Sequence, residues 1–417
     1  MNLWSLIGLL LVLFIAWRFV KALGTSIPIM EMLLLIAALQ WILGPYLSYF
    51  NNYTHYKYYM YVDENTYMSY AVPAFLFFSV IVLFQLPKLD INALQRAVKF
   101  APFAKVLFVI GVSADIGYLY SPPSLLFFLF LLLQFKFVGA ILFLFSEDKK
   151  SQYFFYGTLG YLFLNALARG LFHDLLLWGV FMFMFWSIKN RPSFRLRIAI
   201  ITAGIFFAMG IQIIKGSYRE IIYDGYKGNK LVLFLSVLED KVVNEEITES
   251  DDQNVNIRLN QGWIISAIMY NVPFKEPFSD GGTIAEAVSA SILPRFLDKN
   301  KKMAGGQENF ERYTGLQLGS HTSMGMSLMG ESYANFGVLG GIIFMGVWGL
   351  FLAWYWRGIV FFVRKYPLLL FFIPIIYLQV VKAETELVVV LNHLIKSSIL
   401  IALFLLFASK VFNWRLR

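Results

Sequence analysis

The stretch LWSLIGLLLVLFIAWRFV, from Leu3 to Val20, carries a single charged side chain. About 20 mostly apolar residues in a helix cross the hydrocarbon core of a bilayer, so this stretch predicts a membrane span. It lacks the basic segment and the small-residue cleavage site of a signal peptide, and we expect the helix to be retained. Similar runs recur along the 417 residues, which are 59% hydrophobic and 15% charged. The sequence therefore predicts an all-α polytopic membrane protein.

The apolar runs predict eleven transmembrane helices, which are joined by short connections and by one long loop. We expect eight helices in residues 1–214, a helical loop over residues 215–330, and three further helices in residues 331–417. The eleven runs lie near residues 3–20, 28–47, 68–86, 103–120, 124–145, 152–168, 171–188, 197–214, 331–356, 367–382 and 388–410.

Basic residues in the short loops predict the orientation, because Lys and Arg resist translocation across the membrane. The loop KNRPSFRLR holds Lys189, Arg191, Arg195 and Arg197, and we expect it on the cytoplasmic side. Alternation from this loop puts the other basic clusters of short loops on the same side. The amino terminus and the long loop are then expected outside, and the carboxy terminus inside.

The charge balance follows this topology. The long loop holds 12 Lys and Arg against 15 Asp and Glu, a net −3, whereas the rest of the chain has a net +12. The formal +9 of the whole chain therefore reflects cytoplasmic loops, and no basic patch interleaved with aromatic residues indicates nucleic acid as a partner. The sequence has no cysteine, which excludes thiol chemistry, disulfides and cysteine-bound metal.

The long loop has helical periodicity in three places, and loops of this length commonly carry function. We expect helices over residues 231–247, 256–270 and 283–292, and an irregular segment rich in glycine and polar residues over residues 299–325. The loop is too apolar to float in solvent. We therefore expect it to fold onto the helix bundle as a partly buried cap.

Two arginines of this loop are candidates for binding an anion. Arg258 and Gln261 lie three residues apart in RLNQGW, beside Trp263, so a guanidinium group, an amide and an aromatic ring share one short segment. The combination suits a diphosphate and a sugar, and a surface arginine with an interfacial tryptophan is the alternative. Arg295 follows Pro294 in ILPRFL, where the alternative is a side chain that extends toward lipid headgroups.

Two short connections between predicted helices are charged. ARGLFHDLLLW places Arg169 and His173 four residues apart and Asp174 next, and VVKAETELVV carries Lys382 and Glu384. Ionisable groups at this depth usually have a partner or a function, and both connections are predicted on the side of the long loop. The alternative for the first connection is an internal pair between Arg169 and Asp174.

The stretch GESYANFGVLGG, from Gly330 to Gly341, opens the ninth predicted span with polar and small residues. Glu331, Tyr333 and Asn335 lie where the chain re-enters the bilayer, at the positive end of a helix, which suits anionic groups. The glycines that follow permit the close approach of another backbone or of a lipid chain. The alternative is a helix cap followed by a glycine packing face.

Motifs for common catalytic and cofactor sites are missing from the sequence. It has no G-x-S-x-G, H-E-x-x-H, P-loop or Rossmann fingerprint. His321 lies near Ser320 and Ser323, but these residues alone do not define a catalytic triad, and four scattered histidines do not predict a metal site. Lys136, in LQFKFVG, is predicted near the middle of the membrane, where we expect a buried pair. We expect neither a metal nor a cofactor.

The segments ARGLFHD, RLNQGW, VPF, GGT, LPRFL and GESYANFG together resemble the Wzy-type oligosaccharide repeat-unit polymerases. This family is related to the O-antigen ligases and belongs to the broad GT-C class of membrane glycosyltransferases. The resemblance covers roughly residues 165–400, and the earlier helices match in hydropathy only.

The resemblance implies metal-independent glycosyl transfer at the outer face of the bacterial inner membrane, in the synthesis of a surface polysaccharide. A glycan on undecaprenyl diphosphate would be the donor, and a sugar hydroxyl on a second carrier-linked repeat unit would be the acceptor. A flippase and a chain-length regulator would be partner proteins. In the family, arginines at the outer face offset the charge of the leaving diphosphate, and the matching positions here are Arg169, Arg258 and Arg295.

Other residues are candidates for the base and for substrate binding. The candidates for deprotonating the acceptor hydroxyl are Glu331, which is the first choice, His321 and Asp280. The remaining candidates for substrate binding are Gln261, Trp263, His173, Asp174, Tyr333, Asn335, Lys382 and Glu384, together with Asp280 and His321.

Three other functions stay open from the sequence. An O-antigen ligase would use the same donor and a different acceptor. A flippase for lipid-linked oligosaccharides is the alternative from another class, although transporters tend to have inverted repeats and helices that are broken in mid-membrane. A structural partner in an envelope complex would leave the two charged connections unexplained.

Overall fold

The structure is a computed structural model, and it describes residues 2–51, 58–87, 89, 103–170, 172–242, 259–292, 306–319 and 322–414. Within these residues every regular element is a helix and no strand is present. Helices suit so apolar a chain, because in lipid each backbone N–H and C=O must be bonded within its own segment. The predicted all-α fold is confirmed for the described residues.

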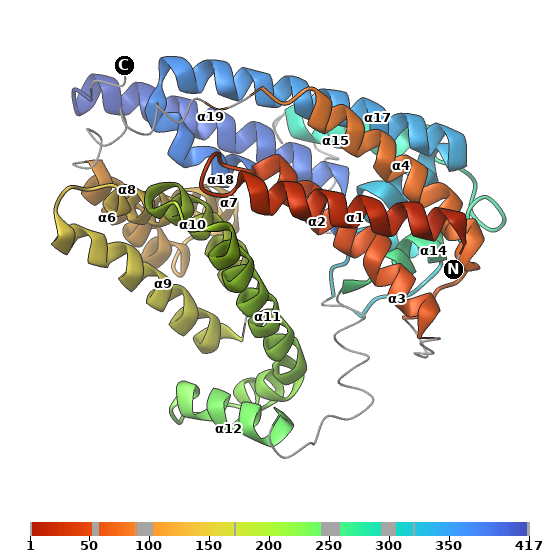
Figure 1. Cartoon of the computed structure of the whole chain (residues 1–417), viewed down its shortest axis with the longest axis horizontal. Helices are drawn as coiled ribbons and strands as arrows, with labels where there is room; N and C mark the ends of the chain where they lie inside the picture. The colour runs from red at the N-terminus through yellow and green to blue at the C-terminus, as the bar shows by residue number, and fades with distance from the viewer. Residues whose placement is uncertain are drawn as a thin grey trace.

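Figure 1 labels the helices in chain order. The first part of the chain forms α1 (Leu3–Ala22), α2 (Ile29–Ala38), a π-helical turn η1 (Leu39–Leu43), α3 (Gly44–Phe50), α4 (Glu64–Phe84), α6 (Phe103–Tyr118), α7 (Pro123–Leu133), α8 (Phe135–Leu144), α9 (Lys149–Arg169) and α10 (His173–Asn190). The second part forms α11 (Phe194–Tyr223), α12 (Lys230–Val242), α14 (Gly262–Asn271), α15 (Gly282–Ile292), α16 (Gln307–Thr314), α17 (Ser327–Lys365), a 3-10 helix η3 (Pro367–Phe372), α18 (Ile373–Tyr377) and α19 (Leu387–Val411).

Seven helical segments of the described chain are long and apolar enough to cross a membrane. Every one of the eleven predicted runs is helical, but α6, α9, α10 and the η3–α18 segment are too short or too polar to meet the same criterion. The chain is therefore a multi-pass helical membrane protein by length and composition, and the number eleven stays a prediction. The seven segments are Leu3–Ala22, Ile29–Phe50, Glu64–Phe84, Pro123–Leu144, Phe194–Tyr223, Ser327–Lys365 and Leu387–Val411.

Large apolar side chains cover the outside of these segments. Leu13, Phe206 and Leu339 are 66%, 67% and 72% exposed, and they lie on α1, α11 and α17. In water each would cost free energy in proportion to its apolar area, and soluble proteins do not expose apolar patches of this extent. The surface therefore indicates that a lipid bilayer surrounds the bundle.

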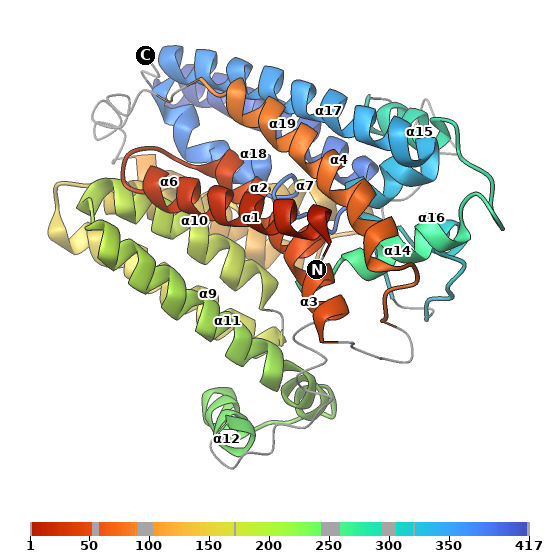
Figure 2. The same ribbon diagram turned by 45° about the vertical axis from the view of Figure 1, so that its right-hand side comes forward.

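The helices pack in two groups. In Figures 1 and 2, α17 and α4 lie side by side, with α19 next to α17 and α1 next to α4. Close packing of α17 on α4 depends on Gly349, because a Cβ there would lie 3.1 Å from the Phe78 carbonyl oxygen. The second group contains α6 to α10, and α11 leads to α12, which belongs to the long loop and packs against α9.

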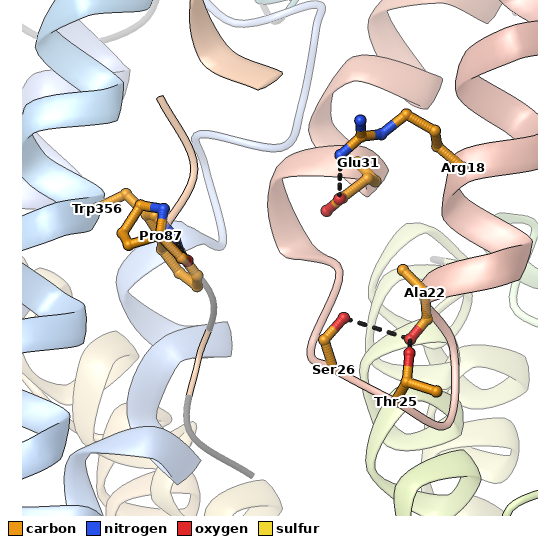
Figure 3. A network of polar contacts seen from close by, with 7 residues as sticks. All are labelled: Arg18, Ala22, Thr25, Ser26, Glu31, Pro87 and Trp356. Atoms are coloured by element: carbon orange, nitrogen blue, oxygen red, sulfur yellow. Dashed lines mark hydrogen bonds and ion pairs between the residues drawn. The ribbon is translucent and has the colours of Figure 1, made fainter. Parts of the chain in front are cut away.

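Polar contacts join helix ends next to two of the predicted cytoplasmic loops, as Figure 3 shows. Arg18 near the end of α1 donates to the Glu31 carboxylate in the first turn of α2, with 3.5 Å between Nη2 and Oε1. Two hydroxyl side chains of the intervening turn donate to the Ala22 carbonyl. The Trp356 indole N–H of α17 donates to the Pro87 carbonyl beyond α4, at 3.3 Å. These bonds fix the α1–α2 hairpin and hold α17 to the end of α4.

The long loop is more helical than its sequence predicts. The structure has helices α12, α14 and α15 within the three predicted ranges, apart from one-residue extensions at the starts of α12 and α15 and at the end of α14. The segment 299–325 was predicted to be irregular, and this is wrong over Gln307–Thr314, which forms α16. Phe310 and Tyr313 are fully buried on one face of that helix, and burial of two aromatic rings stabilises it despite the polar surroundings. α11 also continues to Tyr223, so the long loop begins later than residue 215.

The start of α1 and the end of α19 lie at opposite ends of the bundle in Figure 1. Such an arrangement is required by a topology with the amino terminus outside and the carboxy terminus inside. The assignment of the two ends to the outside and the cytoplasm stays a prediction from the basic loops.

Candidate functional site

The first turns of α17 are separated from the rest of the helix by a break at Gly337. This residue has φ 65° and ψ −157°, which a residue with a side chain adopts only with strain. Just before the break, the carbonyls of Ala334 and Asn335 accept the backbone N–H groups of Ser279 and Asp280, at 3.0 and 3.2 Å. The predicted polar entry of the ninth span is therefore a short buried helix that the long loop holds in place.

Glu331 is buried at this entry, with 2% of its surface exposed, and it connects three helices. Its Oε2 accepts the backbone N–H of Leu387, the first residue of α19, at 2.8 Å. The Thr283 hydroxyl of α15 also bonds to the carboxylate, and Thr283 Oγ1 accepts from Asn335 Nδ2 at 2.7 Å. A carboxylate at the positive end of a helix is favourable. Glu331 therefore fixes the start of α19 against α17 and α15.

The charged turn between α18 and α19 packs directly against the segment that precedes α17. A Cβ at Gly325 would lie 2.8 Å from the Glu384 carbonyl oxygen, so only a glycine permits this contact. Lys382 lines a small cavity together with Leu328 of α17. Burial lowers the pKa of Lys382, and the carboxylates of Asp174 and Glu384 oppose part of that shift. The turn therefore holds a partly buried cation between two carboxylates.

The α9–α10 hairpin carries the other predicted charged connection. Arg169 is the last residue of α9, Gly170 reverses the chain with φ 62°, and His173 and Asp174 open α10. Asp174 lies close enough to Lys382 for their charges to interact, and so does His173. The structure thus brings both predicted charged connections to one end of the bundle. It has no ion pair between Arg169 and Asp174, both of which it describes.

Three basic residues of α11 and α12 complete this end, and they were not among the predicted site residues. The charge of Lys215 acts on His173, while Arg219 Nε and Lys230 Nζ donate to two backbone carbonyls of the hairpin at 2.6 and 2.9 Å. Lys215 and Arg219 lie four residues apart, just beyond the predicted span, so a helix that continues there carries both on one face. This spacing is the sequence signal by which the two residues could have been identified. We call the following set the hairpin cluster: Arg169, His173, Asp174, Lys215, Arg219, Lys230 and Lys382.

Tyr333 and Asp280 both lie near Glu331, but they differ in exposure to solvent. The ring of Tyr333 is 8% exposed and contacts Tyr70 edge-on, with 5.1 Å between the ring centroids. Asp280 is exposed in the turn before α15, with φ 48°. Among the carboxylates near the start of α17, Asp280 is accessible and Glu331 is not.

The α14 candidates pack elsewhere in the cap. Trp263 is 2% exposed, and its ring lies 4.9 Å from that of Tyr58 and 6.2 Å from that of Phe310. The backbone N–H of Gln261 donates to the Gln40 carbonyl at 3.0 Å, which ties the start of α14 to η1. In this structure Trp263 is a packing residue of the cap, and its ring is covered by protein.

Three predicted site residues, Arg258, Arg295 and His321, lie outside the described residues. Within the residues that are described, no three His, Cys, Asp or Glu side chains gather as metal ligands. No protein-family profile, curated protein or solved structure matches the chain. The functional inference therefore depends on the chemistry of the residues themselves.

Proposed function

We propose that the chain is a membrane glycosyltransferase that polymerises oligosaccharide repeat units carried on undecaprenyl diphosphate. The reaction would take place at the outer face of the bacterial inner membrane. One observation supports the proposal most: the hairpin cluster collects five cationic side chains and one carboxylate at a single end of an apolar bundle. A cluster of cations at one membrane face suits an anionic substrate such as a lipid diphosphate.

The proposed reaction exchanges one bond for another at the anomeric carbon of the donor glycan. The bond from this carbon to the diphosphate oxygen breaks, and its electron pair leaves with the diphosphate. The acceptor hydroxyl oxygen forms the new bond, and its proton passes to a base. Fixed cations lower the cost of the charge that builds on the diphosphate, and we assign that role to Lys382 and Arg169. Arg258 and Arg295 join them by resemblance.

We propose Asp280 as the base and Glu331 as a positioning residue. A base needs one accessible carboxylate oxygen within reach of the acceptor hydroxyl, but the Glu331 carboxylate is buried and bonded to Leu387 and Thr283. Asp280 is exposed beside the same helix start. Asp280→Asn should slow polymer formation about a hundredfold, because general bases contribute at least that much, and Glu331→Gln should retain most of the rate. The reverse result would return the role of base to Glu331.

The alternatives differ in acceptor and in the place of the site. A ligase would use the same cluster, so only the product separates it from a polymerase. A transporter site would lie near the middle of the membrane, between broken helices. The break at Gly337 lies ten residues into a helix of 39 residues, and the hairpin cluster lies at helix ends. These positions favour chemistry at a membrane face.

The experiment that tests the proposal is reconstitution of the full chain in liposomes with purified lipid-linked repeat unit. A ladder of products that differ by one repeat unit supports a polymerase. Transfer of the glycan to an added lipid A core without a ladder indicates a ligase. Movement of labelled lipid between leaflets without any transfer indicates a transporter. A flippase and a chain-length regulator, the partner proteins that this function implies, are omitted from the assay.

A further inference from the structure

A cavity of about 480 Å³ lies between α6, α8 and α9. Phe108, Val112 and Ile116 of α6 and Phe154 of α9 form its apolar wall. Its volume falls within the range of small-molecule sites in proteins, which is about 300–1,000 Å³. The cavity is not used by the proposed glycosyl transfer.

One end of the cavity is polar. Lys136 Nζ donates to Asp115 Oδ2 at 2.5 Å and to the Tyr161 hydroxyl at 3.3 Å, and Tyr161 donates to the same Asp115 oxygen at 2.5 Å. Lys136 is 4% exposed, so the predicted buried pair is confirmed, with Asp115 as the partner. Removing two charges from water costs several kcal/mol per ion, and such a pair alone is weak evidence for a role in stability.

The polar end of the cavity retains both a hydrogen-bond donor and a hydrogen-bond acceptor for a ligand. An ammonium group has three N–H donors, and within the described residues Lys136 uses two of them. Asp115 Oδ1 has no hydrogen bond in the same part of the structure. A hydroxyl group can accept from the third N–H and donate to Oδ1 at the same time. It adds no charge to the pair, on which the opposite charges of Arg169 and Asp174 also act, whereas an anion would compete with Asp115 and a cation with Lys136.

The cavity opens toward the lipid-facing side of the bundle. Val112, Ile116 and Phe154 are 37%, 59% and 52% exposed in the isolated chain, so bilayer lipid would contact them. A ligand that enters here comes from the membrane and must carry hydrocarbon to match the wall. Apolar walls and a neutral hydroxyl-binding end together specify an amphiphile.

We propose that this cavity binds a membrane-dissolved molecule with a hydrocarbon chain that ends in an uncharged hydroxyl group. Two sources share this chemistry, a long-chain alcohol and a monoacylglycerol. The hydroxyl contacts Lys136 Nζ and Asp115 Oδ1, and the chain lies along Phe108 and Phe154. Binding requires no glycosyl transfer, but the charge of Arg169, which we assign to that reaction, acts on Asp115 and Lys136 of this cavity.

The test uses the purified full-length chain in detergent micelles. Hexadecanol and a monoacylglycerol, each with a photoreactive diazirine in its chain, are crosslinked in separate arms, and mass spectrometry maps the labelled peptides. Labelling should occur on α6 and α9, and the stronger arm identifies the source. Unlabelled hexadecanol should compete at least about tenfold better than hexadecane, since two hydrogen bonds of about 1 kcal/mol each distinguish them. Equal competition by hexadecane, or stronger competition by palmitate, overturns the proposal.

Two glycines of α9 provide matched variants. A Cβ at Gly157 or at Gly160 meets no described atom within 4 Å, so a leucine fits at either position, and only Gly157 lines the cavity. Gly157→Leu should abolish specific labelling, and Gly160→Leu should retain it. Labelling that survives Gly157→Leu contradicts the assignment.

A second variant tests the polar end without an uncompensated charge. Asp115→Leu combined with Lys136→Met removes both charges, a change that buried pairs often tolerate. The double variant should bind hexadecanol and hexadecane equally. If it keeps the preference for the alcohol, the hydroxyl is bound elsewhere and the proposal fails.

Discussion

Replacement of Glu331 with alanine should separate the start of α19 from α17. The bond from the Leu387 N–H contributes about 1 kcal/mol, the bond from Thr283 adds about the same, and a buried N–H left without a partner costs a further ~1–3 kcal/mol. Alanine removes both acceptors and leaves the Leu387 N–H buried without a partner. We therefore expect Glu331→Ala to lower the free energy of unfolding by about 3 kcal/mol. Glu331→Gln keeps an oxygen for Leu387 and should cost about 1 kcal/mol.

The free energy of unfolding can be measured in mixed micelles by titration with a denaturing detergent, followed by tryptophan fluorescence. Glu147→Ala is the control, because it removes an exposed carboxylate that lies before α9, away from α17 and α19, and should change stability by less than about 0.5 kcal/mol. If Glu331→Ala and Glu331→Gln are equally stable, or if both match Glu147→Ala, then Glu331 does not hold α19 in place.

The same titration checks two further predictions. Burial lowers the pKa of Lys382 from 10.5, so between the lowered pKa and 10.5 the unfolded chain binds more protons than the folded chain. The stability of the wild type should therefore rise with pH in that window, and a Lys382→Met variant that keeps the rise would contradict the assignment. Gly349→Val should cost about 1–3 kcal/mol, because its Cβ meets the Phe78 carbonyl at 3.1 Å. The control Gly358→Val, whose Cβ meets no described atom within 4 Å, should cost less, and equal losses would refute the packing argument.

The helical segments could be predicted because the length of an apolar run is a local property of the sequence. All eleven runs are helical in the structure, and the positions of their ends differ most where packing decides them. α11 continues to Tyr223 because its last turns pack on α12 and the α9–α10 hairpin, as Tyr218 shows by its bond to the Leu167 carbonyl. α16 was not predicted, because its stability comes from burial of Phe310 and Tyr313 against other helices.

The candidate site was predictable in its charged connections but not in their partners. Arg169, His173 and Asp174 could be identified, because ionisable residues are conspicuous in an apolar chain. The interaction of Asp174 with Lys382 joins residues more than 200 positions apart, and no local pattern contains that information. The burial of Glu331 follows from its bond to α19 for the same reason.

The role predicted for Trp263, contact with a sugar, requires an accessible ring, and tertiary structure decides whether the ring is accessible. An exposed and a buried tryptophan look alike in RLNQGW, and only the positions of Tyr58 and Phe310 distinguish them. Lys136 is the opposite case. Its depth in an apolar run required a partner, although the sequence did not identify Asp115.

The initial rate of ladder formation from lipid-linked repeat unit in liposomes tests the central claim most directly. Wild type, Lys382→Gln and Lys150→Gln are compared at equal amounts of inserted protein, with Lys150 serving as an exposed lysine at the start of α9, away from the hairpin cluster. The account predicts equal rates for wild type and Lys150→Gln, and a rate about a hundredfold lower for Lys382→Gln, as for loss of one group that stabilises a developing anion. A wild-type rate in Lys382→Gln, or no ladder from inserted wild-type protein, would contradict it.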